Sequence, residues 1–123
     1  MPVARLLLIE DEPGLRTLIR QYLETQGHEL VCAADGEQGL AKALAADFDL
    51  IICDLLLPGL SGRELCDELL RRRPELARRL LICTGDILSE DTGVFLARTG
   101  LPYITKPFGL REFADFVKAH LRP

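Results

Sequence analysis

The chain has 123 residues, of which 48% are hydrophobic and 28% are charged, and it carries a net charge of −4 at neutral pH. This length suits one soluble domain with its own hydrophobic core, and we expect residues 1–123 to form that domain. The acidic balance argues against intrinsic nucleic-acid binding, and every apolar run is too short to span a membrane.

Four cysteines are present, and no two of them form a close pair such as Cys-x-x-Cys. Such a pair would be typical of a zinc or redox site. Cys53 and Cys83 lie inside apolar segments, where a free cysteine acts as a small hydrophobic residue. The first residues also lack the long apolar region of a secretory signal. We therefore expect a reduced, cytoplasmic protein without structural disulfides.

Apolar strands and amphipathic helices alternate from the start of the chain. Residues 6–9 form a continuous apolar run, which is typical of a strand buried on both faces. Pro13 suits the first turn of a helix, whose apolar residues recur at helical spacing until Gly27 ends it. A second short strand is expected at residues 29–34, and the Asp35-Gly36 turn leads into a second helix.

The third predicted strand, residues 50–54, organises the rest of the chain. Four apolar residues run into Asp54, and a proline and glycines then break the strand. Ser61 is expected to cap the third helix, with Glu64 completing a capping box. Arginines between residues 71 and 79 lie near the end of this helix. Because cations are favourable there, we interpret them as a solvated surface and assign them no site.

The last two strand–helix units follow in the same manner. Strands are expected at residues 80–83 and 103–105, and helices at residues 89–99 and 110–121. The first of these helices has no clean apolar stripe and contains Gly93. An interior glycine costs roughly 1 kcal/mol relative to alanine. We therefore expect the helix at residues 89–99 to be the least rigid of the five.

Five repeats of strand and helix predict an α/β fold with a doubly wound, five-stranded parallel sheet and five helices. The common small version has strand order 2-1-3-4-5, and its switch point lies between the first and third strands. Ligands bind at such a switch point, beyond the carboxyl ends of the strands. The two strands in question end in Asp11 and Asp54, so the sequence predicts an acidic crevice there.

Glu10, Asp11 and Asp54 are the acids expected in this crevice. Two like charges about 4 Å apart repel by roughly 4 kcal/mol at an effective dielectric constant near 20. A bound cation would relieve this repulsion, and carboxylate oxygens favour Mg²⁺, or Mn²⁺ in its place. The alternative is a hydrogen-bonded cluster of protonated acids.

Four short motifs lie where the predicted strands end. They are Glu10-Asp11, Asp54-x-x-x-Pro58-x-x-x-Gly62, Thr84-Gly85 and Lys106-Pro107-Phe108. In this order and at this spacing, the chain closely resembles the receiver domains of two-component response regulators, over essentially its whole length. The resemblance implies a flavodoxin-like, CheY-like fold and a phosphoacceptor signalling domain of a phosphorelay.

By this resemblance, Asp54 is the phosphoacceptor. A carboxylate can attack a phosphoryl group in line and become an acyl phosphate, in a reaction that needs mainly positioning and charge neutralisation. The family suggests that Asp11, Asp54 and the backbone carbonyl of Leu56 ligate Mg²⁺, with Glu10 acting through water. The domain would catalyse its own phosphorylation and dephosphorylation, so we expect no turnover of an external substrate.

The resemblance assigns roles to four further residues. Lys106 and Thr84 bind phosphoryl oxygens, and Pro107 follows a cis peptide bond. Thr84 and Tyr103 form the switch, in which the Thr84 hydroxyl moves toward the phosphoryl group and Tyr103 turns inward. This movement changes the face made by the fourth helix, the fifth strand and the fifth helix.

The phosphoryl donor is expected to be a separate protein. His28 and His120 lack the surroundings of a phosphorylatable histidine, and no nucleotide-binding loop occurs. The resemblance implies a histidine kinase or a histidine phosphotransfer domain as partner, and it allows a homodimer after phosphorylation. Gly100-Leu101-Pro102, ahead of the Lys-Pro-Phe motif, resembles receivers at the C-terminus of hybrid histidine kinases.

Two other functions stay open from the sequence. A phosphatase of the haloacid dehalogenase type also uses a strand-end aspartate and magnesium, but it needs a second aspartate where this chain has Leu56. A degenerate receiver would instead recognise its partners without being phosphorylated. Sustained hydrolysis of phosphomonoesters would favour the first, and absence of an acyl phosphate the second.

Overall fold

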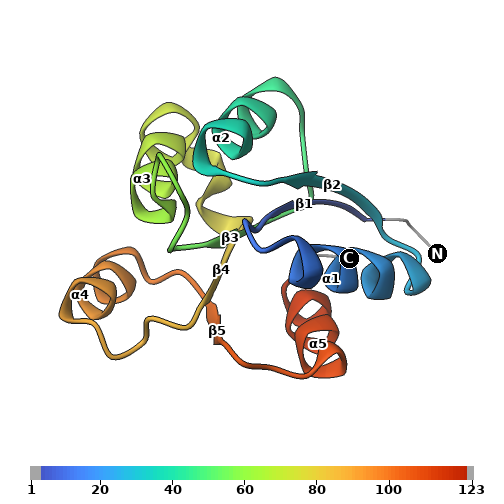
Figure 1. Ribbon diagram of the computed structural model, residues 1–123. Coiled ribbons are helices and arrows are strands. Elements are labelled where there is room, and N and C mark those ends of the chain that lie inside the picture. The colour runs from blue at the N-terminus through green and yellow to red at the C-terminus, as the bar shows by residue number, and fades with distance from the viewer. Residues whose placement is uncertain (1–3, 122–123) are drawn as a thin grey trace.

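The five strands form one parallel sheet in the order β2-β1-β3-β4-β5 (Figure 1). The structure is a computed structural model that describes residues 4–121, so residues 1–3 and 122–123 of the predicted domain lie outside the described residues. The strands are β1 (Arg5–Ile9), β2 (Glu29–Ala33), β3 (Leu50–Asp54), β4 (Leu80–Thr84) and β5 (Tyr103–Thr105). The helices are α1 (Pro13–Thr25), α2 (Gly36–Ala45), α3 (Gly62–Arg72), α4 (Glu90–Thr99) and α5 (Leu110–His120). The predicted fold class and strand order are thus confirmed, and β2 ends one residue earlier than predicted.

The continuous apolar strands are explained by two hydrophobic cores, one on each face of the sheet. Successive residues of a strand point to opposite faces. Leu7 and Ile9 of β1 therefore pack with residues of α2, α3 and α4. Leu6 and Leu8 pack with residues of α1 and α5, which lie side by side in Figure 1. A strand covered on both faces needs an apolar side chain at every position, and this is the pattern that the sequence shows.

The helix ends differ in how well they are capped. Ser61 accepts a hydrogen bond from the Glu64 amide, and the Glu64 carboxylate accepts one from the Ser61 amide, which confirms the predicted capping box of α3. By contrast, Ser89 makes no side-chain hydrogen bond at the start of α4. A β-carbon added at Gly93 of α4 would have no neighbouring atom within 4 Å. α3 therefore has a side-chain cap that α4 lacks, while the lower rigidity of α4 stays a prediction.

The arginines after α3 are held by neighbouring acids and carbonyl groups. Arg71 and Arg72 pair with Glu68. Arg73 pairs with Asp47 at 2.8 Å and also donates to the Ala43 carbonyl, so it fastens the segment after α2 to the end of α3. The five residues that follow, Pro74–Arg78, form a 3-10 turn that the sequence did not predict. These contacts give the arginine cluster a structural role, in agreement with the absence of an assigned site there.

The loop after β3 lies tightly against the end of that strand. A β-carbon at Gly62 would collide with the main chain of Asp54 and Leu55. Glu37 of α2 accepts a hydrogen bond from the Leu60 amide at 2.9 Å, which ties the same loop to the neighbouring helix. The loop is thereby fixed from two sides, and so is the end of β3.

Two further observations concern the described residues as a whole. All four cysteines are free, as the absence of close pairs predicts. Within residues 4–121, no helix combines the length and the apolar character that crossing a membrane requires.

Candidate functional site

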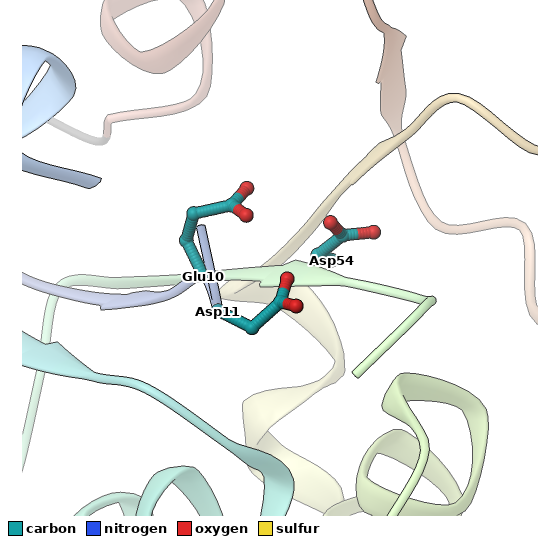
Figure 2. A group of neighbouring side chains, drawn as sticks. All are labelled: Glu10, Asp11 and Asp54. Atoms are coloured by element: carbon teal, nitrogen blue, oxygen red, sulfur yellow. The ribbon is translucent and has the colours of Figure 1, made fainter. Parts of the chain in front are cut away.

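Three carboxylates meet at the carboxyl ends of β1 and β3. Ile9 pairs in register with Cys53, so Glu10 and Asp54 follow at neighbouring strand ends. One oxygen each of Glu10, Asp11 and Asp54 lies within 4.8 Å of the others. Figure 2 shows the three carboxylate groups directed toward a common space beyond the strands. Glu10 and Asp54 are buried and Asp11 is exposed, so this space is open to solvent on one side.

Lys106 reaches this acidic cluster from the end of β5. Its Nζ atom lies 2.6 Å from Oδ2 of Asp54 and 2.8 Å from Oε1 of Glu10. The Lys106 amide donates to the Thr84 carbonyl at 2.9 Å, which fixes its backbone beside the end of β4. The peptide bond between Lys106 and Pro107 is cis. One ammonium therefore bridges two buried carboxylates from different strands.

The second oxygen of Asp54 is held by its own loop. Oδ1 accepts a hydrogen bond from the Leu56 amide at 3.1 Å, while Oδ2 accepts from Lys106. Each carboxylate oxygen of Asp54 is thus held by its own hydrogen-bond donor. Leu56 itself is 55% exposed.

Burial and charge shift the proton affinities of two groups in the cluster. Burial raises the pKa of Glu10, although hydrogen bonds from Lys106 and the Glu12 amide oppose this shift. For Lys106, burial alone would lower the pKa, but hydrogen bonds to Asp54 and Glu10 outweigh it and raise the pKa above its ordinary value. Lys106 therefore stays a cation throughout the physiological pH range.

The residues of the predicted switch lie on β4 and β5. Thr84 is fully buried, and its hydroxyl accepts a hydrogen bond from the Asp86 amide at 3.1 Å. Tyr103 is 46% exposed at the start of β5. In this arrangement the Thr84 hydroxyl is engaged by its own loop, and Tyr103 reaches the surface.

Two residues of the site escaped the sequence analysis. Arg16 of α1 donates to the Glu10 carbonyl at 2.8 Å and, less closely, to the Asp11 carbonyl. Glu12 caps α1 by accepting hydrogen bonds from the Gly14 and Leu15 amides. Both hold the loop that carries the two acids. Glu12 could have been found, because Pro13 marks the start of the helix and a carboxylate just before it can accept hydrogen bonds from the free amides of the first turn.

The donor set suits a small, hard cation. Three carboxylates face one ammonium, so the cluster keeps an excess of negative charge although two of its acids are buried. Carboxylate oxygens with room for water are the ligands that Mg²⁺ prefers. The exposed position of Asp11 leaves that room. The acidic cluster of Glu10, Asp11 and Asp54 is therefore compatible with Mg²⁺ binding.

Comparison with known sequences identifies a domain family that covers most of the chain. Residues 6–118 match the family model described as the response regulator receiver domain. A curated relative is the alkaline phosphatase synthesis transcriptional regulatory protein PhoP of Bacillus subtilis (strain 168), which is 37% identical over 118 residues. That match covers 96% of this chain and 48% of the relative. The chain thus spans about half the length of the curated relatives that it matches.

Solved structures of the same fold cover almost the whole chain. The response regulator TrrA of Thermotoga maritima, in complex with Mg²⁺ and BeF, matches with a TM-score of 0.82 at 28% identity, over 97% of this chain and 100% of that one. The receiver domain of sensor histidine kinase PA1611 of Pseudomonas aeruginosa PAO1 has a magnesium ion coordinated in its active-site cleft. It matches with a TM-score of 0.84 at 28% identity, over 96% of this chain and 97% of that one.

Proposed function

The chain belongs to the response regulator receiver domain family, and we propose on that basis that Asp54 is the residue that accepts the phosphoryl group. The observation that carries the proposal is the bridge between Lys106, Asp54 and Glu10. It holds a nucleophilic carboxylate and a cation for the phosphoryl oxygens at one point, at the carboxyl end of the sheet. In a doubly wound fold this is where ligands bind.

The proposed reaction transfers a phosphoryl group from a phosphohistidine to Asp54. An oxygen of Asp54 attacks phosphorus as the bond from phosphorus to the histidine nitrogen breaks, and the imidazole leaves with that electron pair and takes up a proton. Lys106 binds one phosphoryl oxygen, and the Thr84 hydroxyl binds another after it leaves the Asp86 amide. Each autophosphorylation of this kind consumes one donor molecule, and the phosphoryl group stays on the chain until it is hydrolysed.

Magnesium is the proposed cofactor, and Mn²⁺ could replace it. Asp11, Asp54 and the backbone carbonyl of Leu56 would ligate the ion, with Glu10 acting through water. When bound, the ion neutralises charge that develops on the phosphoryl oxygens. The matched structures of TrrA and of the PA1611 receiver domain contain magnesium, which supports this assignment.

The proposed output is a change at the face of α4, β5 and α5. As Thr84 moves toward the phosphoryl group, Tyr103 turns from its exposed position toward the space that Thr84 leaves. Response-regulator relatives imply histidine kinases as partners, and we propose a histidine kinase or a histidine phosphotransfer domain as donor. A homodimer through this face is the proposed consequence of phosphorylation.

Nucleic-acid binding, attachment to a hybrid kinase and cellular location are further parts of the proposal. The chain covers only 48% of a curated relative that is a transcriptional regulator, so the expectation of no nucleic-acid binding stays a prediction about this chain alone. The attachment to a hybrid kinase also stays a prediction. Free cysteines agree with a cytoplasmic location.

The proposal is tested with acetyl phosphate as a small-molecule donor, followed by mass spectrometry of the intact protein. We expect one phosphoryl group per chain, dependent on Mg²⁺ and absent in Asp54→Asn. Asp115→Asn, which changes an exposed acid of α5, should behave like the parent protein. Equal labelling of Asp54→Asn and the parent would overturn the assignment. Phosphate release in large excess over the protein, with an added phosphomonoester, would instead favour the phosphatase, which the family match does not support.

A further inference from the structure

Thr92 is a buried polar residue that the proposed function leaves unexplained. Among residues 4–121, four polar or charged residues are buried: Glu10, Asp54, Thr84 and Thr92. The first three belong to the site described above. Thr92 lies in α4 and has 0% of its surface exposed. A buried hydroxyl needs a hydrogen-bond partner, and the identity of that partner links α4 to the site.

The partner of Thr92 is Asp86, in the loop between β4 and α4. Oγ1 of Thr92 donates to Oδ2 of Asp86 at 2.9 Å. The amide of the same Asp86 donates to Oγ1 of Thr84 at 3.1 Å. Two hydrogen bonds through Asp86 therefore connect Thr92 of α4 with the Thr84 hydroxyl, which is the proposed ligand of the phosphoryl group.

This connection matters because it ties the loop to α4 through a side chain, beside the packing of Ile87 against the core and the bond from the Gly93 amide to the Ser89 carbonyl. Ser89 makes no side-chain cap at the start of α4, and the Leu88 side chain is 97% exposed. In the part of the chain that the structure describes, the Thr92–Asp86 bond is the only side-chain hydrogen bond between this loop and α4. Loss of this hydrogen bond should therefore make the loop between β4 and α4 more mobile.

We propose that Thr92 is a positioning residue which, through Asp86, holds Thr84 in the unphosphorylated arrangement. This inference rests on the proposed function. The Thr84 side chain cannot move toward a phosphoryl group on Asp54 without stretching the hydrogen bond from the Asp86 amide, unless Asp86 moves with it relative to α4. The bond from Thr92 resists that movement. Without it, the arrangement that binds the phosphoryl group becomes easier to reach, as a population shift requires.

The test uses beryllofluoride with Mg²⁺, a stable substitute for a phosphoryl group on a carboxylate. Thr92→Val keeps the shape of the side chain and removes the hydroxyl. We expect it to bind beryllofluoride about fivefold more tightly than the parent, because a net hydrogen bond contributes about 1 kcal/mol. The affinity for Mg²⁺ alone should stay within about twofold, since Thr92 touches none of the three acids. A purely structural role would not separate these two affinities.

Two further variants separate the hydrogen bond from other effects. Thr92→Ser keeps the hydroxyl and should bind beryllofluoride like the parent protein. Asp86→Ala removes the acceptor from a partly exposed loop and should shift the affinity in the same direction as Thr92→Val. If Thr92→Val does not fold, as judged by circular dichroism, Asp86→Ala compared with the parent decides the question.

The outcomes distinguish this inference from the proposed function. A parent protein that binds no beryllofluoride in the presence of Mg²⁺ contradicts the proposed function, and the inference falls with it. A parent protein that binds, together with a Thr92→Val variant of equal or weaker affinity, overturns the inference alone. Isothermal titration calorimetry gives both affinities for every variant.

Discussion

The Nζ atom of Lys106 lies 2.6 Å from Oδ2 of Asp54, although 52 positions separate the two residues in the sequence. The contact joins the loop after β5 to the end of β3, and it also includes Glu10 at the end of β1. A cation at this point compensates two buried carboxylates while no other cation is bound. It also lies where oxygens of an incoming phosphoryl group would need a positive charge.

Removal of the ammonium by Lys106→Met should weaken both stability and phosphoryl transfer. Because Glu10 and Asp54 lose a charged partner in a buried site, we expect the free energy of unfolding in chelator to fall by roughly 2 kcal/mol. The rate of phosphorylation by acetyl phosphate should fall roughly 100-fold. Added Mg²⁺ should restore part of the stability but not the rate, as measured by urea unfolding and by mass spectrometry.

Lys42→Met is the matched control for that variant. Lys42 also uses its Nζ atom in a hydrogen bond, to the Cys32 carbonyl, but it lies outside the acidic cluster. Its stability should fall modestly and its phosphorylation rate should stay within about twofold of the parent. Equal losses of rate in the two lysine variants would show that the ammonium of Lys106 has no special role.

Magnesium should raise the thermal stability of the protein through Asp11. At a concentration of 100 times the dissociation constant, a ligand that binds only the folded state adds about 2.7 kcal/mol. Asp11→Asn should abolish most of this gain, and in chelator it should be more stable than the parent because one repelling charge is gone. Differential scanning fluorimetry with and without EDTA measures both effects. If Mg²⁺ does not change the melting temperature of the parent protein, the proposed metal site is refuted.

Gly62 and Gly93 should respond to alanine in opposite ways. A β-carbon at Gly62 meets the main chain of Asp54 and Leu55, so Gly62→Ala should destabilise the fold by roughly 3 kcal/mol and disturb the acceptor loop. Gly93 lies in α4 with open space around it, so Gly93→Ala should stabilise the fold by roughly 1 kcal/mol. Urea unfolding of the two variants tests the pair. A Gly62→Ala variant as stable as the parent would contradict the close packing of this loop against Asp54 and Leu55.

The amides of α4 should exchange with solvent faster than those of α3. The capping box of Ser61 and Glu64 satisfies the first turn of α3, whereas Ser89 makes no such bond for α4. Backbone amides of the first turn that lack a side-chain hydrogen-bond acceptor favour local opening of the helix. Hydrogen exchange followed by mass spectrometry on peptides from the two helices measures the difference, and equal protection would contradict it.

The sequence was sufficient for the fold because both faces of the sheet are covered. The inner strands β3 and β4 then need apolar residues at nearly every position, as in residues 50–53, and such runs are visible without a structure. The acids at the ends of β1 and β3 could be placed together because the strand order common in small folds of this kind puts these two strands side by side. The contact between Lys106 and Asp54 was expected only from the resemblance.

Other features could not be predicted because they depend on where side chains reach in three dimensions. Arg16 looked like an ordinary residue of an amphipathic helix, yet it turns back to carbonyls of the preceding loop. Arg73 belonged to a basic cluster, and its partner Asp47 lies 26 positions away. Thr92 gave no signal, since a threonine in a helix is usually exposed, and only its burial shows that its hydroxyl needs Asp86.

The most direct measurement for the central claim is the location of the phosphoryl group after reaction with acetyl phosphate and Mg²⁺. Borohydride reduces an aspartyl phosphate to homoserine, and peptide mass spectrometry then identifies the position. We expect homoserine at position 54 alone, and none when the donor or Mg²⁺ is omitted. Homoserine at position 11 or elsewhere, or its absence from a protein that has taken up phosphate, would contradict the assignment of Asp54 as phosphoacceptor.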